Sequence, residues 1–377
     1  MMDRKIVFLT GTRADFGKIK GLISAIEDKN HFHPYIFVTG MHLMHEYGYT
    51  LLEVERCGYE HIHTFSNHTH ETTMDLTLAK TIEGFSEYVK EINPDLIVVH
   101  GDRVEALAGA IVGSLNNILV AHIEGGEISG TIDELIRHSV SKLSHIHYTS
   151  NDEAKKRLIQ MGELPESIYT IGSPDIDVMF SDTLPSIVEV KRYYEIPFES
   201  YAVAMYHPVT TEIDNIKDDA NSFVEALKQS DKNYVLIFPN NDLGSQFIID
   251  AYSELKQNSN FRIFPSIRFE YFLTLLKHSN FMIGNSSAGV REAPYYGIPS
   301  IDIGSRQKNR VKLSSVINCD CIVDNIVNAI NNIDSLELKK MQIFGFGDSA
   351  SLFLQSLESN DIWSIDHQKQ FKDIDGA

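Results

Sequence analysis

Short apolar runs alternate with longer amphipathic segments along almost the whole chain, and this alternation constrains the fold more than any other feature. Five runs in the first half are nearly continuously apolar: Ile6–Thr10, Tyr35–Thr39, Leu96–His100, Ile118–His122 and Ile146–Thr149. Such runs are typical of strands buried on both faces of a parallel sheet. The segments between them, which have helical length, include Leu78–Glu91, Val104–Leu115 and Ile132–Leu143. The alternation predicts a doubly wound α/β domain.

A second alternating set follows a break in this pattern. Its predicted strands are Ala202–Tyr206, Val235–Phe238, Arg262–Phe264, Phe281–Gly284 and Ser300–Ile303. The break lies at Gly172-Ser173-Pro174-Asp175, where we expect the interdomain linker. The 377 residues therefore predict a first domain over 1–172, a second over 173–355 and a C-terminal segment over 356–377. Two such domains facing a cleft would bring the carboxyl ends of their strands, and a ligand, to the interface.

The charge of the chain narrows the classes of partner. The formal net charge is −19, whereas proteins that bind nucleic acids or anionic membranes need basic surfaces. A phosphate ligand is compatible with this charge, because a few arginines and helix N-termini can hold it locally. No stretch approaches the ~20 apolar residues of a membrane span, and the run Lys5–Thr10 is too short for a signal peptide. We expect a cytoplasmic protein without nucleic-acid or membrane partners.

Cysteine and histidine spacing gives no sign of a metal site. The three cysteines, Cys57, Cys319 and Cys321, are too few and too scattered for a disulfide framework. Cys319 and Cys321 have the spacing of half a metal site, but no second pair matches them. The histidines between residues 61 and 70 lack the spacing of a zinc-binding helix. We expect no metal and no cofactor.

Candidate site residues in the first half follow the predicted strands. Arg13 lies in the turn Gly11–Asp15, where its guanidinium can pair with a phosphate, although the spacing matches neither a P-loop nor a dinucleotide fingerprint. Asp102 and Arg103 follow the third strand, and Asp102 is either a candidate acid or a helix N-cap. Glu124 follows the next strand, directly before two glycines.

Asp133 and Arg137 stand one turn apart at the start of the predicted helix Ile132–Leu143. A capping box and an i,i+4 ion pair account for this pattern in structural terms. The cap would also leave Asp133 aimed at the cleft. Asp102, Glu124 and Asp133 would then converge from neighbouring strand ends. Their mutual repulsion would raise at least one pKa, which suits acid–base catalysis near neutral pH.

In the second half, His207 and the run Asn285–Gly289 each follow a predicted strand. The run begins a predicted helix that contains Glu292. Hydroxyl residues at a helix N-terminus offer N–H groups and a favourable dipole to a phosphate, and simple helix capping is the alternative. Arg306 and neighbouring cations follow the strand Ser300–Ile303 at the same expected edge.

These motifs occur together and in order in one known family. The blocks are Gly11–Asp15, His100–Glu105, His122–Glu127, Asp133–Arg137, His207, Asn285–Glu292 and Gly297–Arg310. As a set they resemble the UDP-N-acetylglucosamine 2-epimerases over residues 4 to 310. The resemblance implies a GT-B-like α/β fold, in which two doubly wound Rossmann-like domains face a cleft and the C-terminal segment packs on the first domain. It also implies a homodimer or a higher homo-oligomer.

Within the family, the chain is most similar to the hydrolysing branch. The similarity is carried by Gly-Thr-Arg-Ala-Asp at 11–15, His-Gly-Asp-Arg at 100–103, Asn-Ser-Ser-Ala-Gly-Val-Arg-Glu at 285–292 and Arg-Gln at 306–307. Non-hydrolysing members typically have Gly-Thr-Arg-Pro-Glu at the first block and Thr-Glu-Arg-Pro-Glu near the last, and neither is present here. The resemblance implies conversion of UDP-N-acetylglucosamine and water to N-acetylmannosamine and UDP for sialic acid synthesis.

The resemblance also implies roles for individual residues. Asp102, Glu124 and Asp133 match the catalytic carboxylates, and His207 matches the family's cleft histidine. The matches to substrate-binding positions are Arg13, Arg103, Arg137, Phe272, Ser286, Ser287, Gly289, Glu292 and Arg306. Among these, Phe272 would contact the uracil, and Glu292 would accept hydrogen bonds from the ribose hydroxyls.

Three alternatives stay open at this point. The first is a hydrolysing 2-epimerase that acts on UDP-N,N′-diacetylbacillosamine in a legionaminic acid pathway, because the sequence does not fix the groups at sugar C4 and C6. The second is a GT-B glycosyltransferase, which would need an acceptor site and would not call for three carboxylates. The third is a non-catalytic UDP-sugar-binding module, which would not need the acids.

Overall fold

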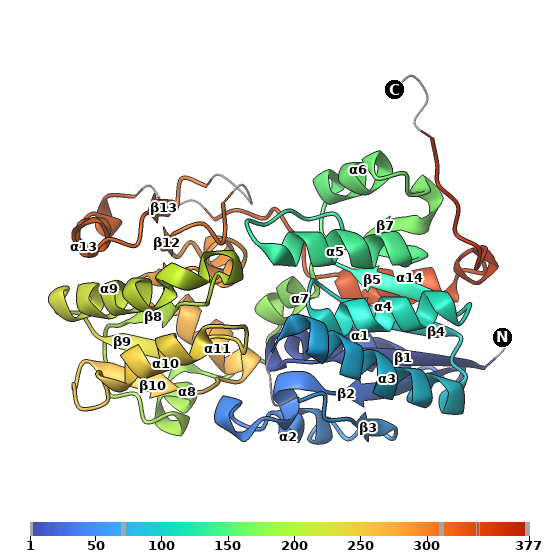
Figure 1. The fold of residues 1–377 in the computed structure, drawn as a ribbon, viewed down its shortest axis with the longest axis horizontal. Coiled ribbons are helices and arrows are strands. Elements are labelled where there is room, and N and C mark those ends of the chain that lie inside the picture. The colour runs from blue at the N-terminus through green and yellow to red at the C-terminus, as the bar shows by residue number, and fades with distance from the viewer. Residues whose placement is uncertain (1–2, 69–72, 309–312, 337, 339, 374–377) are drawn as a thin grey trace. The chain divides into compact units, whose positions relative to one another are not determined.

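The computed structural model describes residues 3–68, 73–308, 313–336, 338 and 340–373, and the chain divides into two compact units (Figure 1). The first consists of Met1–Glu127, Asp133–Ser181 and Ile343–Ala377, and the second of Ile128–Ile132 and Asp182–Gln342. The first unit thus runs past the boundary expected at residue 172, to Ser181. The C-terminal part returns to the first unit from Ile343, earlier than the expected residue 356.

The described residues of the first unit form a parallel sheet of seven strands in the order β3-β2-β1-β4-β5-β6-β7. The strands are β1 (Arg4–Thr10), β2 (Phe32–Val38), β3 (Ile62–Thr64), β4 (Leu96–His100), β5 (Leu119–Ile123), β6 (Ile146–Thr149) and β7 (Ile168–Thr170). Since every pairing is parallel, the carboxyl ends of β4 and β5 lie at the same edge. The expected doubly wound α/β class is confirmed.

Helices connect these strands and cover both faces of the sheet. They are α1 (Arg13–Glu27), α2 (Leu51–Glu55), α3 (Met74–Ile92), α4 (Val104–Leu115), α5 (Ile132–Leu143), α6 (Asp152–Gln160), α7 (Pro174–Phe180) and α14 (Ser349–Glu358). Alternate residues of β1 face opposite layers, as the two-residue period of a strand requires. Phe8 contacts Phe353 of α14, with 6.4 Å between ring centroids. Leu9 faces α4, where a Cβ on Gly109 would lie 3.3 Å from its side chain.

The sequence predicted the bounds of several elements correctly. β4, α4 and α5 have the expected bounds, Leu96–His100, Val104–Leu115 and Ile132–Leu143. The strands β3 and β7 were missed because each has three residues and forms an edge of the sheet. The expected linker was also misplaced. Pro174 is the first residue of α7, a position that proline favours, so the Gly-Ser-Pro-Asp pattern marks a helix start here.

Helix α14 fixes the C-terminal part of the chain to the first unit. The ring of Phe353 lies 5.0 Å from that of Tyr148, and the Tyr148 hydroxyl is 2.7 Å from the Ser356 hydroxyl. Phe353 is fully buried. Burial of such a side chain stabilises a fold by about 1.5–3 kcal/mol.

The polar tail after α14 contacts the end of α5. Lys369 Nζ donates hydrogen bonds to the carbonyl oxygens of Ser141, Lys142 and Ser144, at 3.0, 3.0 and 2.5 Å. The same ammonium lies 2.5 Å from the carboxylate of Glu163. A cation at a helix C-terminus interacts favourably with the helix dipole. The tail therefore holds the last turn of α5 in place.

The described residues of the second unit form a six-stranded parallel sheet in the order β10-β9-β8-β11-β12-β13. The strands are β8 (Ala202–Met205), β9 (Tyr234–Ile237), β10 (Phe261–Phe264), β11 (Met282–Gly284), β12 (Ser300–Ile303) and β13 (Val316–Cys319). β13 was not predicted, because its polar and half-buried residues give no continuous apolar run.

The longest described helix of the second unit, α9, has 14 residues, compared with 19 in α3 of the first. They are α8 (Ile187–Tyr193), α9 (Ile216–Gln229), α10 (Ser245–Ser253), α11 (Phe269–Lys277), α12 (Glu292–Tyr296) and α13 (Val323–Asn331). The prediction of a single helix after β11 was wrong. In its place a 3₁₀ turn, η5 (Ser287–Gly289), precedes the five-residue helix α12. Pro294 lies inside α12 and limits its length on the N-terminal side.

Two features are absent from the described residues. Among the described helices, none is long and apolar enough to span a membrane. In the same part of the chain, no group of three or more Cys, His, Asp or Glu side chains is arranged to hold a metal ion.

The end of β11 requires glycine, which gives a first prediction. Gly284 has φ 134°, and a Cβ there would lie 1.8 Å from the Met205 carbonyl oxygen of the neighbouring strand. We expect Gly284→Ala to destabilise the protein by at least about 1 kcal/mol. Gly21→Ala is the control, because a Cβ at Gly21 in α1 meets nothing within 4 Å and should stabilise by about 0.4–1 kcal/mol. Thermal unfolding midpoints measure both changes, and equal midpoints for the two variants would contradict the prediction.

Candidate active site

The turn after β4 carries Asp102 and Arg103. The Asp102 carboxylate accepts a hydrogen bond from the guanidinium of Arg137 in α5, and Arg137 is 2% exposed. Arg103 is the N-cap residue of α4, and its Nε lies 3.5 Å from the carboxylate of Glu105. Asp102 is therefore not the N-cap that the sequence left open as an alternative. Its carboxylate instead neutralises a buried cation.

Glu124 follows β5 in a left-handed backbone conformation. Its φ of 64° costs a non-glycine residue roughly 1–2 kcal/mol, and its N–H donates to the Tyr148 carbonyl at 2.8 Å. The side chain is 6% exposed, and its carboxylate accepts a hydrogen bond from the Ser173 hydroxyl. Lys18 Nζ and His100 Nε2 each lie 3.4 Å from this carboxylate. These partners offset the cost of burying the acid.

Lys18 also reaches a second buried acid. Its Nζ lies 3.4 Å from Asp175, which is fully buried at the start of α7. The sequence interpretation placed Asp175 in the linker and did not consider it as a site residue. One lysine therefore lies between two carboxylates that come from different elements.

Asp133 lies partly exposed in the first turn of α5, one turn before Arg137. Because Arg137 binds Asp102, helix α5 connects the position of Asp133 to the end of β4. Asp102 and Glu124 follow adjacent strands, since His100 pairs with Ile123 at the ends of β4 and β5.

The backbone N–H groups of the turn after β1 are hydrogen-bonded to side chains of the same turn. The Asp15 carboxylate accepts the N–H groups of Gly11 and Thr12 at 3.0 and 3.1 Å, and the Thr12 side chain accepts the N–H of Asp15 at 3.2 Å. This reciprocal pair is a capping box for α1. Arg13, the phosphate-binding candidate of this turn, lies 3.7 Å from the carboxylate of Glu53.

In the second unit, Asn285 holds the backbone that follows β8. Its side chain accepts the N–H of His207 at 2.6 Å and donates to the His207 carbonyl at 2.8 Å. The N–H of Asn240 donates to Nδ1 of His207 at 3.0 Å. Because Nδ1 accepts this bond, the proton of the neutral ring lies on Nε2. Two amides thus fix the backbone and the tautomer of this histidine.

The positions expected to bind the nucleotide lie on α11, η5 and α12. Ser286 precedes η5, and its hydroxyl accepts the N–H two residues further on at 3.4 Å. Ser287 begins η5, and Glu292 begins α12. Glu292 and Phe272 are nearly buried. A Cβ on Gly289 would make only an ordinary contact at 3.5 Å, so packing does not require glycine there.

Arg306 and Gln307 both bind the end of β11. The Arg306 guanidinium and the Gln307 amide donate to the Asn285 carbonyl at 3.3 and 2.8 Å. The N–H of Gly130, from the segment that joins the second unit, donates to the Arg306 carbonyl at 3.2 Å. The last two residues of the sequence block Gly297–Arg310 lie outside the described residues.

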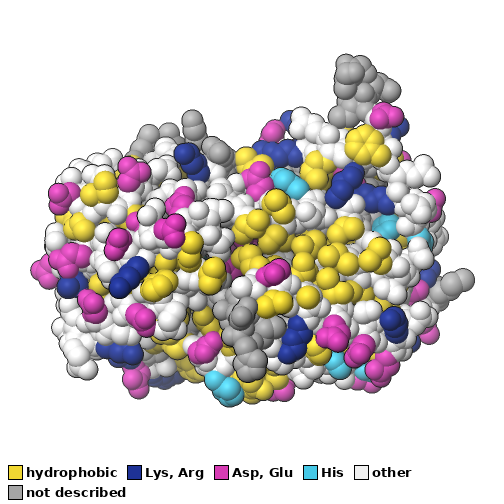
Figure 2. Space-filling model, in the orientation of Figure 1, with side chains coloured by type: hydrophobic (Ala, Val, Ile, Leu, Met, Phe, Trp, Pro, Cys, Tyr) yellow, Lys and Arg dark blue, Asp and Glu magenta, His cyan; other side chains and the backbone are white. Residues whose placement is uncertain are grey.

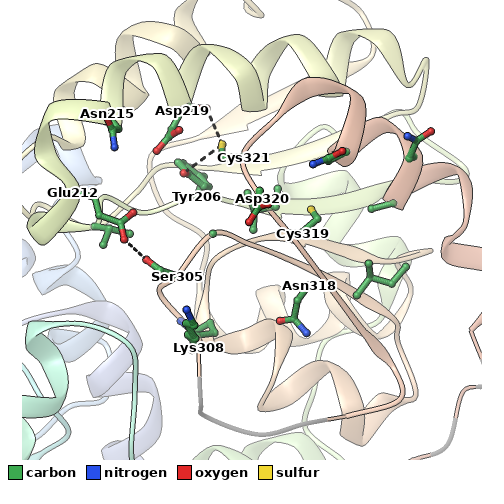
Figure 3. Close-up of a pocket in the computed structure, with 18 of the residues that line it drawn as sticks. Tyr206, Glu212, Asn215, Asp219, Ser305, Lys308, Asn318, Cys319, Asp320 and Cys321 are labelled. Carbon is green, nitrogen blue, oxygen red and sulfur yellow. Dashed lines mark hydrogen bonds between the residues drawn. The ribbon is translucent and has the colours of Figure 1, made fainter.

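A hollow of about 1160 Å³ lies beside this loop in the second unit (Figure 3). Ser305 donates to Glu212 at 2.6 Å across its wall, and Cys321 donates to the Asp219 carbonyl at 3.2 Å. Burial raises the pKa of Cys321 to about 12. This thiol therefore stays protonated at neutral pH, and a protonated thiol is a poor nucleophile and a poor metal ligand.

The residues that the sequence interpretation missed are the partners of the candidates. Lys18 contacts Glu124 across 106 residues of sequence, and Asn240 contacts His207 across 33. No local spacing marks such pairs. Asn285 could have been noticed, because it belongs to the sequence block Asn285–Glu292 that resembles the family. Its place in that block does not reveal that its side chain binds the backbone of His207.

Comparison with known proteins gives a consistent assignment. The sequence model described as UDP-N-acetylglucosamine 2-epimerase matches residues 24–358. The chain is 49% identical over 375 residues to the UDP-N-acetylglucosamine 2-epimerase of Neisseria meningitidis serogroup B, covering 98% of this chain and 99% of that protein. It is 33% identical over 365 residues to the UDP-N,N′-diacetylbacillosamine 2-epimerase (hydrolyzing) of Legionella pneumophila, covering 95% and 96%. The polysialic acid biosynthesis protein P7 of Escherichia coli is 34% identical over 334 residues, covering 87% and 85%.

Solved structures show the same fold. The UDP-GlcNAc 2-epimerase of Methanocaldococcus jannaschii, in complex with UDP-GlcNAc and UDP, matches with a TM-score of 0.79 at 20% identity, over 94% of this chain and 99% of that chain. The Neisseria meningitidis UDP-GlcNAc 2-epimerase bound to UDP-GlcNAc matches with a TM-score of 0.77 at 18% identity, over 94% and 99%. These matches confirm the expected GT-B-like class. With a family match that spans most of its length, the chain belongs to the UDP-N-acetylglucosamine 2-epimerase family.

Proposed function

We propose that this protein is a hydrolysing UDP-N-acetylglucosamine 2-epimerase, which converts UDP-N-acetylglucosamine and water to N-acetylmannosamine and UDP. The observation that carries the proposal is the pair of acids after β4 and β5, each beside a buried cation: Asp102 with Arg137, and Glu124 with Lys18. The 49% identical relative supports the substrate. Two relatives of 33% and 31% identity whose names include "hydrolyzing" support the release of UDP.

The reaction needs help at C2 of the sugar, because the C2 proton is not adjacent to a carbonyl. When the C1–O bond breaks, its electron pair leaves with UDP, and the positive charge at C1 acidifies the C2–H bond. One carboxylate then removes the C2 proton, giving 2-acetamidoglucal. Addition of water places a hydroxyl on C1 and a proton on the opposite face of C2. One water is consumed, and N-acetylmannosamine and UDP are the products.

The first unit supplies the proton transfers in this proposal. Asp102, Glu124 and Asp133 are the proposed proton-transfer groups. Arg137 orients the Asp102 carboxylate, and Lys18 orients that of Glu124. A base for C2 and an acid for its opposite face require at least two carboxylates, which this set provides.

Most of the proposed UDP contacts come from the second unit. The proposed substrate-binding residues are Arg13, Arg103 and Arg137 of the first unit and Phe272, Ser286, Ser287, Gly289, Glu292 and Arg306 of the second. Arg306 stabilises the departing diphosphate by charge, which lowers the barrier to C1–O cleavage. Glu292 accepts hydrogen bonds from the ribose hydroxyls, and His207 presents Nε2–H as a donor.

A second candidate substrate is UDP-N,N′-diacetylbacillosamine. The relatives from Legionella pneumophila and Campylobacter jejuni, at 33% and 31% identity, are named for this sugar. The chemistry at C1 and C2 would be the same. The 34% identical polysialic acid biosynthesis protein P7 instead supports a role in sialic acid synthesis, which we favour together with the 49% identical relative.

We further propose that the protein forms a homodimer or a larger homo-oligomer. Figure 2 shows hydrophobic side chains gathered on the visible face of the first unit. Independently of that view, Leu115 at the C-terminal end of α4 is an apolar side chain that is 77% exposed. Exposed apolar patches of this kind mark protein–protein surfaces.

Light scattering tests the oligomeric state. The measured molar mass should be a multiple of the 42.6 kDa chain mass, and Leu115→Glu should reduce that molar mass. A wild-type mass of one chain would contradict this proposal.

Proton NMR of the purified protein with UDP-N-acetylglucosamine in D₂O tests the main proposal. We expect free UDP together with N-acetylmannosamine that carries deuterium at C2, because the proton returned to C2 comes from solvent. Accumulation of UDP-N-acetylmannosamine would show the non-hydrolysing reaction instead. Turnover of only the 2,4-diacetamido sugar nucleotide would establish the second substrate.

Single neutralising substitutions test the carboxylates. We expect Asp102→Asn, Glu124→Gln and Asp133→Asn each to lower kcat by about 10²–10⁴-fold, the range for lost acid–base catalysis. Glu134→Gln is the matched control for Asp133→Asn, since it removes one negative charge from the same helix turn. Activity of Asp133→Asn equal to that of the control would remove Asp133 from the mechanism.

A further inference from the structure

His122 is a fully buried histidine in β5 that no step of the proposed reaction uses. Its Nε2 lies 2.7 Å from the Gly101 carbonyl oxygen, and its Nδ1 lies 3.0 Å from the Ser141 hydroxyl. A carbonyl oxygen only accepts, so Nε2 carries the proton and donates to Gly101. Nδ1 must then accept, and Ser141 is its donor. The two contacts together permit one tautomer of the ring.

The ring also remains neutral. Burial lowers the pKa of His122 to about 3, and although the bond to Gly101 opposes this shift, the charges of His147, Arg137 and His100 add to it. A ring with no exposure to solvent and no charge near neutral pH does not exchange protons with a substrate. Its contribution is therefore geometric.

The ring connects two elements that carry candidate catalytic residues. Gly101 has φ 74° and precedes Asp102, and its N–H donates to the Ile123 carbonyl at 3.0 Å. Both polar groups of the Gly101 backbone are thus held by β5. Ser141 follows Arg137 by one turn on α5, so both lie on the same helix face.

The sequence around His122 makes room for this arrangement. A Cβ on Gly125 would lie 2.8 Å from the Ser141 hydroxyl and 2.9 Å from Nδ1 of His122. The first glycine after Glu124 is therefore explained by the space that the ring and the hydroxyl occupy. On the other side, Lys369 donates to the Ser141 carbonyl at 3.0 Å, so the tail fixes the same turn of α5.

We propose that His122 and Ser141 are positioning residues for the Asp102–Arg137 pair. The relay from Ser141 through His122 to Gly101 sets the turn after β4 against α5, next to the direct contact between Asp102 and Arg137. This inference rests on the proposed function, in which Asp102 takes part in catalysis. Orientation of a reacting group within a fraction of an ångström is worth a large part of an enzyme's rate, so the relay is expected to affect kcat.

Ser141→Ala is the decisive variant. Without the hydroxyl, Nδ1 loses its donor and the ring is no longer bonded to α5, although the Gly101 carbonyl still selects the Nε2–H tautomer. We expect kcat to fall by about 10- to 100-fold, with KM within about twofold of wild type. Ser139→Ala is the matched control, because the Ser139 hydroxyl lies on the same helix and bonds only locally to the Leu135 carbonyl, at 2.8 Å. The control should retain wild-type kcat.

Two substitutions of His122 distinguish the contribution of its bond to Gly101 from that of its bond to Ser141. In His122→Gln, the side-chain amide reaches the Nε2 position and can still donate to Gly101, whereas His122→Asn keeps a polar atom only near Nδ1. We expect the glutamine variant to retain more kcat than the asparagine variant. Equal kcat in both, at equal thermal stability, would contradict a positioning role.

Hydrogen–deuterium exchange supplies a readout that does not depend on activity. We expect the backbone amides of residues 101–103 to exchange faster in Ser141→Ala than in Ser139→Ala, because the turn is released. Unchanged exchange would overturn this inference whatever the activity. If wild type releases no UDP from its substrates, the proposed function fails, and the exchange result still decides whether the relay holds the turn. If wild type is active and Ser141→Ala has wild-type kcat, this inference fails and the proposed function stands.

Discussion

A charged side chain buried without partners is unfavourable by several kcal/mol, and this constraint organises the carboxyl edge of the first sheet, where Glu124 and Arg137 are buried. Glu124 is held by Lys18 from α1 and by Ser173 from the start of α7, and Asp102 is held by Arg137 from α5. Each partner comes from a different element. The positions of these helices on the sheet are therefore set by charge pairing as well as by apolar packing, and errors in helix placement would leave a buried charge uncompensated.

The sequence predicted those elements whose formation depends on local pattern. Leu96–His100 and Val104–Leu115 have the expected bounds because an unbroken apolar run and a long apolar helix admit few alternatives. The three-residue edge strands β3 and β7 have no such pattern, since half of their surroundings is solvent or loop. We expected the first unit to end at residue 172, but it ends at Ser181. The two cases could not be told apart because a proline that starts a helix and a proline in a linker have the same local sequence.

The candidate site shows the same limit more sharply. Glu124 could be singled out from its place between a buried strand and two glycines. Its partner Lys18 could not, because the contact depends on how α1 crosses the sheet. In the second unit, His207 was expected from the sequence, whereas its contacts with Asn240 and Asn285 arise only when three strand ends come together. The candidate catalytic positions leave a local mark in the sequence, and the residues that hold them in place mostly do not.

The left-handed backbone at Glu124 has a consequence for laboratory evolution. Glycine occupies this conformation without the roughly 1–2 kcal/mol that another residue pays there, but it would take a partner from Lys18 and from Ser173. A screen for heat resistance alone would therefore meet two opposing effects at this position, a gain in backbone freedom and a loss of side-chain contacts. The same substitution would remove a proposed catalytic acid, so a thermostabilising campaign should hold position 124 fixed and seek its gains elsewhere.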